Sequence, residues 1–194
     1  MIQSKEDLRY YLKEDRKAQH KEINPSFKQI IAEFLFPDQN YEFIKCLRYV
    51  EYYTNCKDIF MVGVKRLYYI KRLAKLRSIT GIELSPNCVG PGLHISHGKV
   101  VVGFDAKIGR NCKILSDVTI GSQGRYDRGG NPQIGDRVFI GSGVRIIGNI
   151  QIADDVVIGA NSVVLHSIVE PGITVAGIPA KKVSNTGSYH YLNK

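Results

Sequence analysis

The chain has 194 residues and a net charge of +9, from 27 Lys and Arg against 18 Asp and Glu. It has no apolar run near the ~20 residues that span a bilayer, and its start lacks the apolar region of a signal peptide. We therefore expect a cytoplasmic protein with one large domain or two small ones, and no membrane-spanning helix.

The cysteines do not indicate a metal site or a disulfide framework. They show no C-x-x-C pair and no histidine at ligand spacing. Their positions are Cys46, Cys56, Cys88 and Cys112. We expect reduced thiols, mostly buried as small hydrophobic side chains.

Residues 1–80 are predicted to form an α-helical domain. Ser4 begins a pattern that resembles a capping box, and apolar residues continue at helical spacing, so a first helix should run from about Lys5 to Ala18. A second helix is expected between Pro25 and Pro37. Two further apolar patterns with helical spacing cover residues 41–53 and 59–79.

The last of these helices is strongly basic. Its cations are Lys65, Arg66, Lys71, Arg72, Lys75 and Arg77. A basic amphipathic helix can contact a membrane surface or an anionic ligand, but a solvated face is the simpler interpretation. Peripheral membrane contact therefore stays open as an alternative.

After Gly81 the spacing changes to a repeat of six residues. Its regular part places branched aliphatic residues at Ile134, Ile140, Ile146, Ile152, Ile158 and Val164. Turn-forming residues stand between them. This pattern is typical of a hexapeptide β-helix, in which three sides of six residues make one coil and the coils stack. A β-sandwich is the alternative, but its turns come every ~8–12 residues.

The first half of the repeat is irregular. Ile95 to Val102 is a step of seven residues, and Ile120 to Ile134 is a step of fourteen, two more than two sides. We interpret residues 121–133 as an excursion loop from a β-helix domain that covers residues 81–183. Residues 184–194 are expected to form a polar tail that is loose at its end. Irregular steps often mark functional sites, so catalytic residues are sought here.

His97 is the candidate general base. It lies within the seven-residue step, and an imidazole that titrates near neutrality can remove a proton from a hydroxyl group. Glu83, almost one coil earlier, could hold its other nitrogen. His94 is a competitor for this role, and an exposed corner histidine without a role is the alternative. A zinc site would need a third ligand near the two histidines, and none is found.

The sequence motifs of nucleotide hydrolysis, dinucleotide binding and nucleophile-elbow hydrolases are absent. The chain has no P-loop, no G-x-G-x-x-G and no G-x-S-x-G pattern. Only the positive charge argues for nucleic acid, so no nucleic-acid partner is expected.

Several motifs resemble the left-handed β-helix acyltransferases, most closely the serine acetyltransferases. Residues 82–86 (I-E-L-S-P) are similar to V-D-I-H-P in that family, 93–97 (L-H-I-S-H) to M-L-D-H, and 146–150 (I-I-G-N-I) to I-L-G-N-I. Residues 158–165 and 176–181 match two further motifs, I-G-A-G-S-V-V-L and A-G-V-P-A-R. The resemblance runs from about Gly81 to Val183.

The resemblance implies an α+β fold with an N-terminal helical segment and a left-handed parallel β-helix. It also implies trimers that bind acetyl-CoA, without a metal, in the groove between neighbouring chains, and the helical segments could pair two trimers. By this resemblance His97 is the general base and Glu83 replaces the aspartate that orients it. The coenzyme would meet Gly121, Ser142, Gly143, Ala160, Lys181 and Lys182.

The acceptor-binding residues depart from the family pattern. The aspartate that precedes the catalytic histidine is Ser96 here, and an arginine-histidine pair is replaced by Gly130 and Asn131. A neutral hydroxyl compound would instead meet hydrogen-bonding and stacking groups of the loop, which are Arg125, Tyr126, Asp127 and Asn131.

The sequence therefore predicts an acetyl-CoA-dependent O-acetyltransferase, with a sugar of a surface polysaccharide as the favoured acceptor. Serine O-acetylation for cysteine biosynthesis is the first alternative. A non-catalytic β-helix scaffold that docks through its basic helices is the second.

Overall fold

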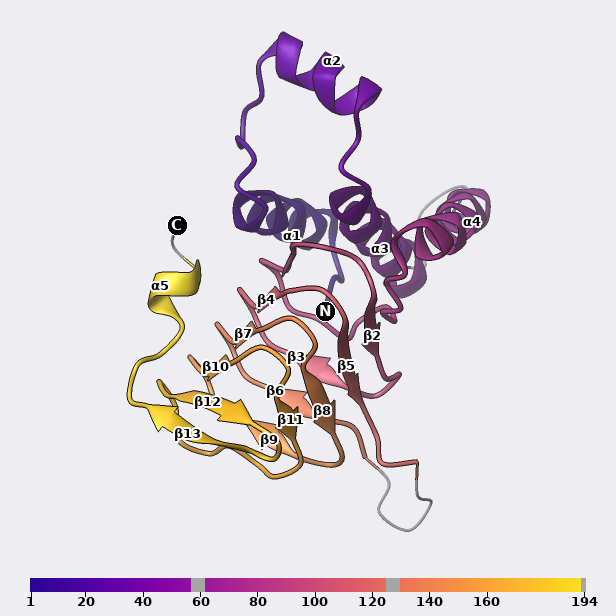
Figure 1. The fold of residues 1–194 in the computed structure, drawn as a ribbon. Coiled ribbons are helices and arrows are strands. Elements are labelled where there is room, and N and C mark those ends of the chain that lie inside the picture. Colours follow the sequence, from indigo (N-terminus) through magenta and orange to yellow (C-terminus); the bar gives the residue numbers. More distant parts are fainter. Residues whose placement is uncertain (57–61, 125–129, 193–194) are drawn as a thin grey trace.

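A computed structural model gives the structure of residues 1–56, 62–124 and 130–192 (Figure 1). The N-terminal segment is helical, as predicted, and a coil of short parallel strands follows it. The helices are α1 (Lys5–Ala18), α2 (Phe27–Leu35), α3 (Gln39–Asn55) and α4 (Val62–Thr80). A short helix, α5 (Tyr189–Leu192), lies near the C-terminus.

Local capping explains where the first three helices begin. The Ser4 side chain accepts a hydrogen bond from the backbone N–H of Asp7, which starts α1 at the predicted residue. Ser26 and Gln29 form a capping box at the start of α2. Asp38 accepts from the N–H groups of the first residues of α3.

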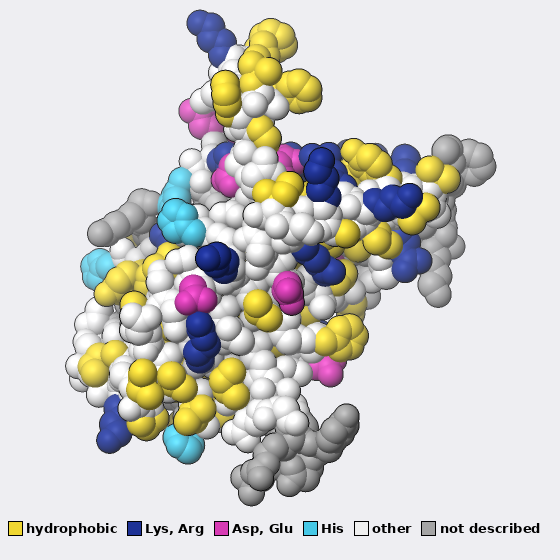
Figure 2. Space-filling view, turned by 45° about the vertical axis from the view of Figure 1, so that its right-hand side comes forward, with side chains coloured by type: hydrophobic (Ala, Val, Ile, Leu, Met, Phe, Trp, Pro, Cys, Tyr) yellow, Lys and Arg dark blue, Asp and Glu magenta, His cyan; other side chains and the backbone are white. Residues whose placement is uncertain are grey.

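The helix α2 projects away from the rest of the chain (Figures 1 and 2). A bidentate pair between Arg16 on α1 and Glu33 on α2, with the shorter contact at 2.8 Å, links it to the other helices. Its apolar side chains stay in solvent, and Phe27 and Phe34 are 76% and 82% exposed.

The repeat region forms three sheets that wrap around one core. The first sheet contains β1 (His94–Ile95), β4 (Lys113–Ile114), β7 (Phe139–Ile140), β10 (Val157–Ile158), β12 (Thr174–Gly177) and β13 (Ala180–Ser184). The second contains β2 (Val100–Val102), β5 (Val118–Gly121), β8 (Arg145–Ile147) and β11 (Val163–Val164). The third contains β3 (Lys107–Ile108), β6 (Gln133–Ile134) and β9 (Gln151–Ile152).

The strand register confirms a coil of eighteen residues. Val100 pairs with Val118, and Gln133 pairs with Gln151, each pair 18 positions apart and parallel. Lys113 pairs with Phe139, 26 positions on, because eight extra residues leave the coil between them. The fourteen-residue step is therefore one side plus eight inserted residues, and our division into two sides plus two was wrong.

Each of the three corners between the sheets has its own character. The His97 corner joins the first and second sheets, and its turns contain Lys99, Asp117, Gly143 and Asn161, all with positive φ. The loop corner joins the second and third sheets and contains Gly103, Asn131 and Gly148. The tail corner joins the third and first sheets and contains Asn111, Arg137 and Asp155.

The helices and the first coil share one core. Phe43 and Leu47 of α3 and Leu76 of α4 belong to the same buried cluster as Ile82 and Ile95 of the coil. Each buried aliphatic side chain contributes about 1.5–3 kcal/mol, so this cluster holds the two segments together.

A buried charge network crosses the same junction. Arg48 of α3 is fully buried, and its Nε donates to Asp15 of α1 at 2.8 Å. Its other nitrogens donate to the carbonyl oxygens of Val89 and Gly90 in the first coil, at 2.9 and 2.7 Å. Although burial opposes the charge, Asp15 and Glu51 raise the pKa of Arg48. The guanidinium therefore stays charged.

The C-terminal segment packs more closely than the polar tail that we expected. Ser188 is fully buried, and its Oγ donates to the Asp155 carboxylate at 3.1 Å. The Tyr191 ring lies 4.6 Å from the Phe139 ring of β7. These contacts hold α5 against the β-helix.

Candidate active site

His97 lies on an exposed turn between β1 and β2. Val100 follows His94 by six positions, whereas in the stacked segment Val118 follows Lys113 by only five. The extra residue lies in the turn that contains His97, so the side chain is exposed there, as the seven-residue step predicted. Asn40 of α3 supports the turn, because its Nδ2 donates to the Ser96 carbonyl oxygen at 3.4 Å.

Gly98, the residue after His97, must be a glycine for a steric reason. A Cβ at Gly98 would lie 1.9 Å from the carbonyl oxygen of Thr80. That same oxygen accepts a hydrogen bond of 2.9 Å from the N–H of Lys99. The turn can therefore stack on the end of α4 only without a side chain at position 98.

A depression of about 560 Å³ opens beside His97. It is lined by Thr80, His97, Gly98, Lys99, Ser116 and Asp117. Arg145 holds the Asp117 carboxylate with contacts of 3.2 Å, whereas Lys99 has no ion-pair partner within the residues that the structure describes. Sequence reasoning missed Lys99 and Asp117, although their separation of exactly one coil, 18 residues, was a usable signal.

Glu83 lies on the coil beneath, where its backbone pairs with Val101. It is exposed, and it lines a separate depression of about 410 Å³ with Arg77, Ser78, Leu84, Ser85 and Val102. Among the described residues no hydrogen bond or ion pair joins Glu83 to His97. Catalytic hydrogen bonds are often long before substrate binds, so the His97–Glu83 pair stays a prediction.

His94 has a structural partner. Its Nδ1 contacts the carbonyl oxygen of Ala18 at the end of α1 at 2.5 Å, and its ring packs edge-on against His20, 5.5 Å away. Burial lowers the pKa of His94 below its usual value, although the contact with Ala18 opposes this. His94 therefore links β1 to α1, whereas His97 faces solvent.

Small residues continue the His97 corner along the stack. Ser142 lies one coil beyond Ser116, with 3.4 Å between the two hydroxyl oxygens, and its carbonyl oxygen accepts from the N–H of Asn161 at 2.8 Å. A Cβ at Gly141 would lie 2.7 Å from the N atom of Ala160. The predicted coenzyme contacts Ser142, Gly143 and Ala160 thus share one corner, and it is the corner of His97.

Lys181 and Lys182 lie in the hairpin of β12 and β13. Both side chains are exposed, and Lys182 forms an ion pair of 2.5 Å with Glu170. Gly177, in the same hairpin, donates its N–H to the Ser162 hydroxyl at 3.1 Å. The turn between β12 and β13 therefore lies beside the His97 corner, at the end of the stack away from His97.

Gly121 and Asn131 lie at the loop corner. A Cβ at Gly103 would lie 2.4 Å from Asn131 Oδ1 and 3.4 Å from Gly121 Cα. The second sheet, about 10 Å wide for a four-residue strand, separates these two residues from the His97 corner of the same chain. The predicted acceptor residues Arg125, Tyr126 and Asp127 lie outside the described residues.

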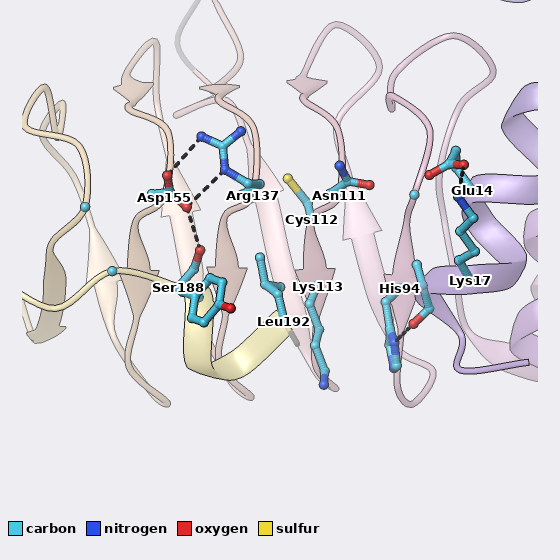
Figure 3. Close-up of a pocket in the computed structure, with 15 residues that line it drawn as sticks. Glu14, Lys17, His94, Asn111, Cys112, Lys113, Arg137, Asp155, Ser188 and Leu192 are labelled. Atoms are coloured by element: carbon cyan, nitrogen blue, oxygen red, sulfur yellow. Dashed lines mark hydrogen bonds and ion pairs between the residues drawn. The ribbon is translucent and has the colours of Figure 1, made fainter. Parts of the chain in front are cut away.

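A second depression of about 560 Å³ lies at the tail corner and contains none of the predicted catalytic residues (Figure 3). His94, Lys113 and Leu192 line it, and Arg137, Asp155 and Ser188 form a chain of polar contacts at one side. Residues of α1 and of the C-terminal segment with α5 wall it, and the sequence did not predict that α5 folds back over the β-helix.

Within residues 1–56, 62–124 and 130–192 no group of three or more metal-binding side chains is found. In the same ranges no helix is long and apolar enough to cross a bilayer. Cys46, Cys88 and Cys112 are free and buried, as predicted.

Comparison with known proteins agrees with this geometry. The family described as bacterial transferase hexapeptide (six repeats) matches residues 131–166. The serine acetyltransferase of Helicobacter pylori (strain ATCC 700392 / 26695) is 43% identical over 124 residues, which cover 62% of this chain and 72% of that protein.

Solved structures give the same result over most of the chain. A serine acetyltransferase from Neisseria gonorrhoeae, in complex with serine, superposes with a TM-score of 0.70 at 31% identity, covering 93% of this chain and 71% of that one. The enzyme from Brucella abortus strain S19, in complex with coenzyme A, has a TM-score of 0.72 at 26% identity, covering 94% and 70%.

The stacked coils and the exposed histidine corner thus define a left-handed β-helix acyltransferase of the hexapeptide-repeat type, which uses acetyl-CoA. Within that class, the chain belongs to the serine acetyltransferase family.

Proposed function

We propose that the protein transfers the acetyl group of acetyl-CoA to the hydroxyl group of L-serine, with His97 as general base. One observation carries the proposal: exposed His97 lies in the first turn of the corner whose later turns contain Ser142, Gly143 and Ala160. A thioester carried along that corner would reach the imidazole. The serine complex of the Neisseria relative supports the choice of acceptor.

The reaction needs one proton to be moved and returned. The His97 imidazole takes the proton of the acceptor hydroxyl while the oxygen attacks the thioester carbonyl. The tetrahedral intermediate then collapses, the carbon–sulfur bond breaks, and the thiolate takes the proton from the imidazolium. Glu83 steadies the imidazolium, and a main-chain N–H, for which Gly121 is our candidate, stabilises the oxyanion.

Two charged residues beside His97 suit a zwitterionic acceptor. Lys99 can bind the carboxylate of serine, and Asp117, fixed by Arg145, can bind its ammonium group. They would replace the charges that the family pattern places at positions 96, 130 and 131.

A second acceptor class is supported by those same replacements. Ser96 and Asn131 offer hydrogen bonds without charge, which suits a neutral hydroxyl compound such as a sugar of a surface polysaccharide. Arg125, Tyr126 and Asp127 stay predicted contacts for such an acceptor.

The separation of the two corners supports a trimer. Gly121 and Asn131 flank one edge of the second sheet, and His97 flanks the other. In a ring of three chains the loop corner of one could face the His97 corner of the next, and acetyl-CoA would lie between them. Lys181 and Lys182 would meet its phosphates as point charges. Pairing of two trimers through the helices, and a cytoplasmic location, remain further parts of the proposal.

Thiol release from acetyl-CoA tests the function. We expect release with L-serine, and at least a ~10²-fold lower turnover for His97→Ala. His166→Ala, at another exposed histidine of the repeat region, is the matched control and should be fully active. Unchanged turnover of His97→Ala would reject the mechanism. Release with neutral sugars but not with L-serine would select the second acceptor class.

A further inference from the structure

The helix α4 presents an unusual surface. Within the described part of the chain, one side of it is covered: Leu73 and Leu76 are buried, and Tyr69 stacks on Tyr49 of α3 with 4.6 Å between the ring centroids. The opposite side faces solvent. The helix contains six Lys and Arg and no Asp or Glu.

Most of these cations have no partner among the residues that the structure describes. Arg72 forms an ion pair of 2.7 Å with Glu42, and Arg77 donates to the Leu84 carbonyl oxygen at 3.0 Å. The other four have neither an ion-pair nor a hydrogen-bond partner within the described part of the chain, and all four are exposed. They are Lys65, Arg66, Lys71 and Lys75.

Apolar side chains lie among the cations on the exposed side. Val64, Leu67 and Tyr68 are 65%, 54% and 56% exposed. Positions 64, 67, 68, 71 and 75 follow the three-to-four spacing of one helix face, so aliphatic, aromatic and cationic groups form one stripe. Figure 2 shows hydrophobic and basic side chains mixed at the end of the molecule that carries α4.

We propose that the exposed face of α4 binds the surface of a bilayer that contains anionic phospholipids. The aliphatic and tyrosine side chains would enter the boundary between head groups and acyl chains, and the unpaired cations would meet the phosphates. This inference does not depend on the identity of the acceptor.

Charge and apolarity together select this partner over two others. Two α4 helices packed against each other in a symmetric dimer would bring like charges together, which opposes a contact with a second copy. A nucleic acid would pair with the cations but would leave Val64 and Leu67 in water. An anionic bilayer satisfies both groups at once.

The position of α4 gives the contact a consequence for the site. Its last residue, Thr80, lines the depression beside His97. A bilayer along α4 would therefore lie near the acceptor-binding region.

Cosedimentation of the full chain with vesicles tests the proposal. We expect binding to equimolar phosphatidylcholine and phosphatidylglycerol, and little binding to phosphatidylcholine alone. Each cation near an anionic surface raises the partition coefficient about fivefold, so the double variant K71Q/K75Q should bind about thirtyfold more weakly. Leu67→Gln should weaken binding without changing its salt dependence.

The matched control removes two exposed lysines from α1. K5Q/K13Q has the same net charge as K71Q/K75Q, and both of its sites are exposed. It should bind like the wild type, and circular dichroism should show that all variants are folded. Equal binding to both vesicle types, or equal loss in the two double variants, would overturn the proposal. A change of oligomeric state in K71Q/K75Q would overturn it in favour of a contact between copies, and vesicle-independent binding to DNA would overturn it in favour of nucleic acid.

Discussion

Replacing Arg48 by methionine should strongly destabilise the protein. Methionine keeps much of the volume but removes the charge that faces Asp15 and Glu51, which are each 1% exposed. The carbonyl oxygens of Val89 and Gly90 lose their donor as well. Removing one partner from a buried ion pair costs about 3–5 kcal/mol. Against a total of about 5–15 kcal/mol for a typical domain, this is a large loss.

Urea unfolding followed by circular dichroism measures this loss as a change in the free energy of unfolding. Arg137→Met is the control, because it breaks the partly exposed ion pair of 2.9 Å with Asp155. Exposed pairs contribute about 0.2–1 kcal/mol, so this variant should unfold at nearly the wild-type urea concentration. If Arg48→Met costs no more than Arg137→Met, the buried network does not hold the helices to the coil as argued.

Further predictions concern the acceptor, pH and coil packing. Because Lys99→Ala removes one charged contact with the substrate, it should raise KM for L-serine by roughly 10–100-fold and leave kcat nearly unchanged. Initial rates measure both constants, and an unchanged KM would show that Lys99 does not bind the acceptor. Burial lowers the pKa of His94 below 6.5, so just below pH 6.5 the folded protein binds fewer protons than the unfolded chain, and the free energy of unfolding should rise with pH there. His94→Gln should flatten this pH dependence in urea unfolding measured at several pH values, and an unaltered dependence would mean that other groups cause it. Gly98→Ala should lower the free energy of unfolding by about 1–3 kcal/mol, because the new Cβ would clash with the backbone of Thr80, whereas the Cβ of Gly121→Ala meets no atom within 4 Å and this variant should unfold like the wild type. Equal thermal stability of the two variants would contradict the argument that the turn stacks on α4 only without a side chain at position 98.

The sequence predicted the core of the β-helix well, because a hexapeptide repeat is a local pattern with a single structural solution. The repeated aliphatic residues from Ile134 to Val164 are all at most 5% exposed. The size of the excursion was wrong, because spacing does not say to which side of the coil each flanking residue belongs. Strand pairing of Lys113 with Phe139 was needed to count the eight inserted residues.

The helices show a similar limit. The bounds of α1 followed from the capping pattern at Ser4, which is a local interaction. The apolar face of α2 was also visible in the sequence, but its exposure was not, because amphipathic spacing does not reveal what covers a helix. The packing of Ser188 on Asp155 was missed since it joins positions 33 residues apart.

In the candidate site, the seven-residue step predicted that His97 would be exposed. The resemblance supplied Ser142, Gly143 and Ala160, and the structure places them on one corner with His97. The contact between His97 and Glu83 stays a prediction. Its formation depends on side-chain rotamers and on bound substrate, which repeat spacing does not encode.

The buried network of Arg48 also solves a problem that every stacked coil faces. The terminal rung of a parallel stack offers unpaired backbone groups, which can recruit another chain and extend the stack into a fibre. Here α1 and α3 cover the N-terminal rung, with Asp15 accepting from the N–H groups of Gly92 and Leu93. At the opposite end the antiparallel strand β13 closes the first sheet. The protein thus fixes its own number of rungs and discourages end-to-end polymerisation.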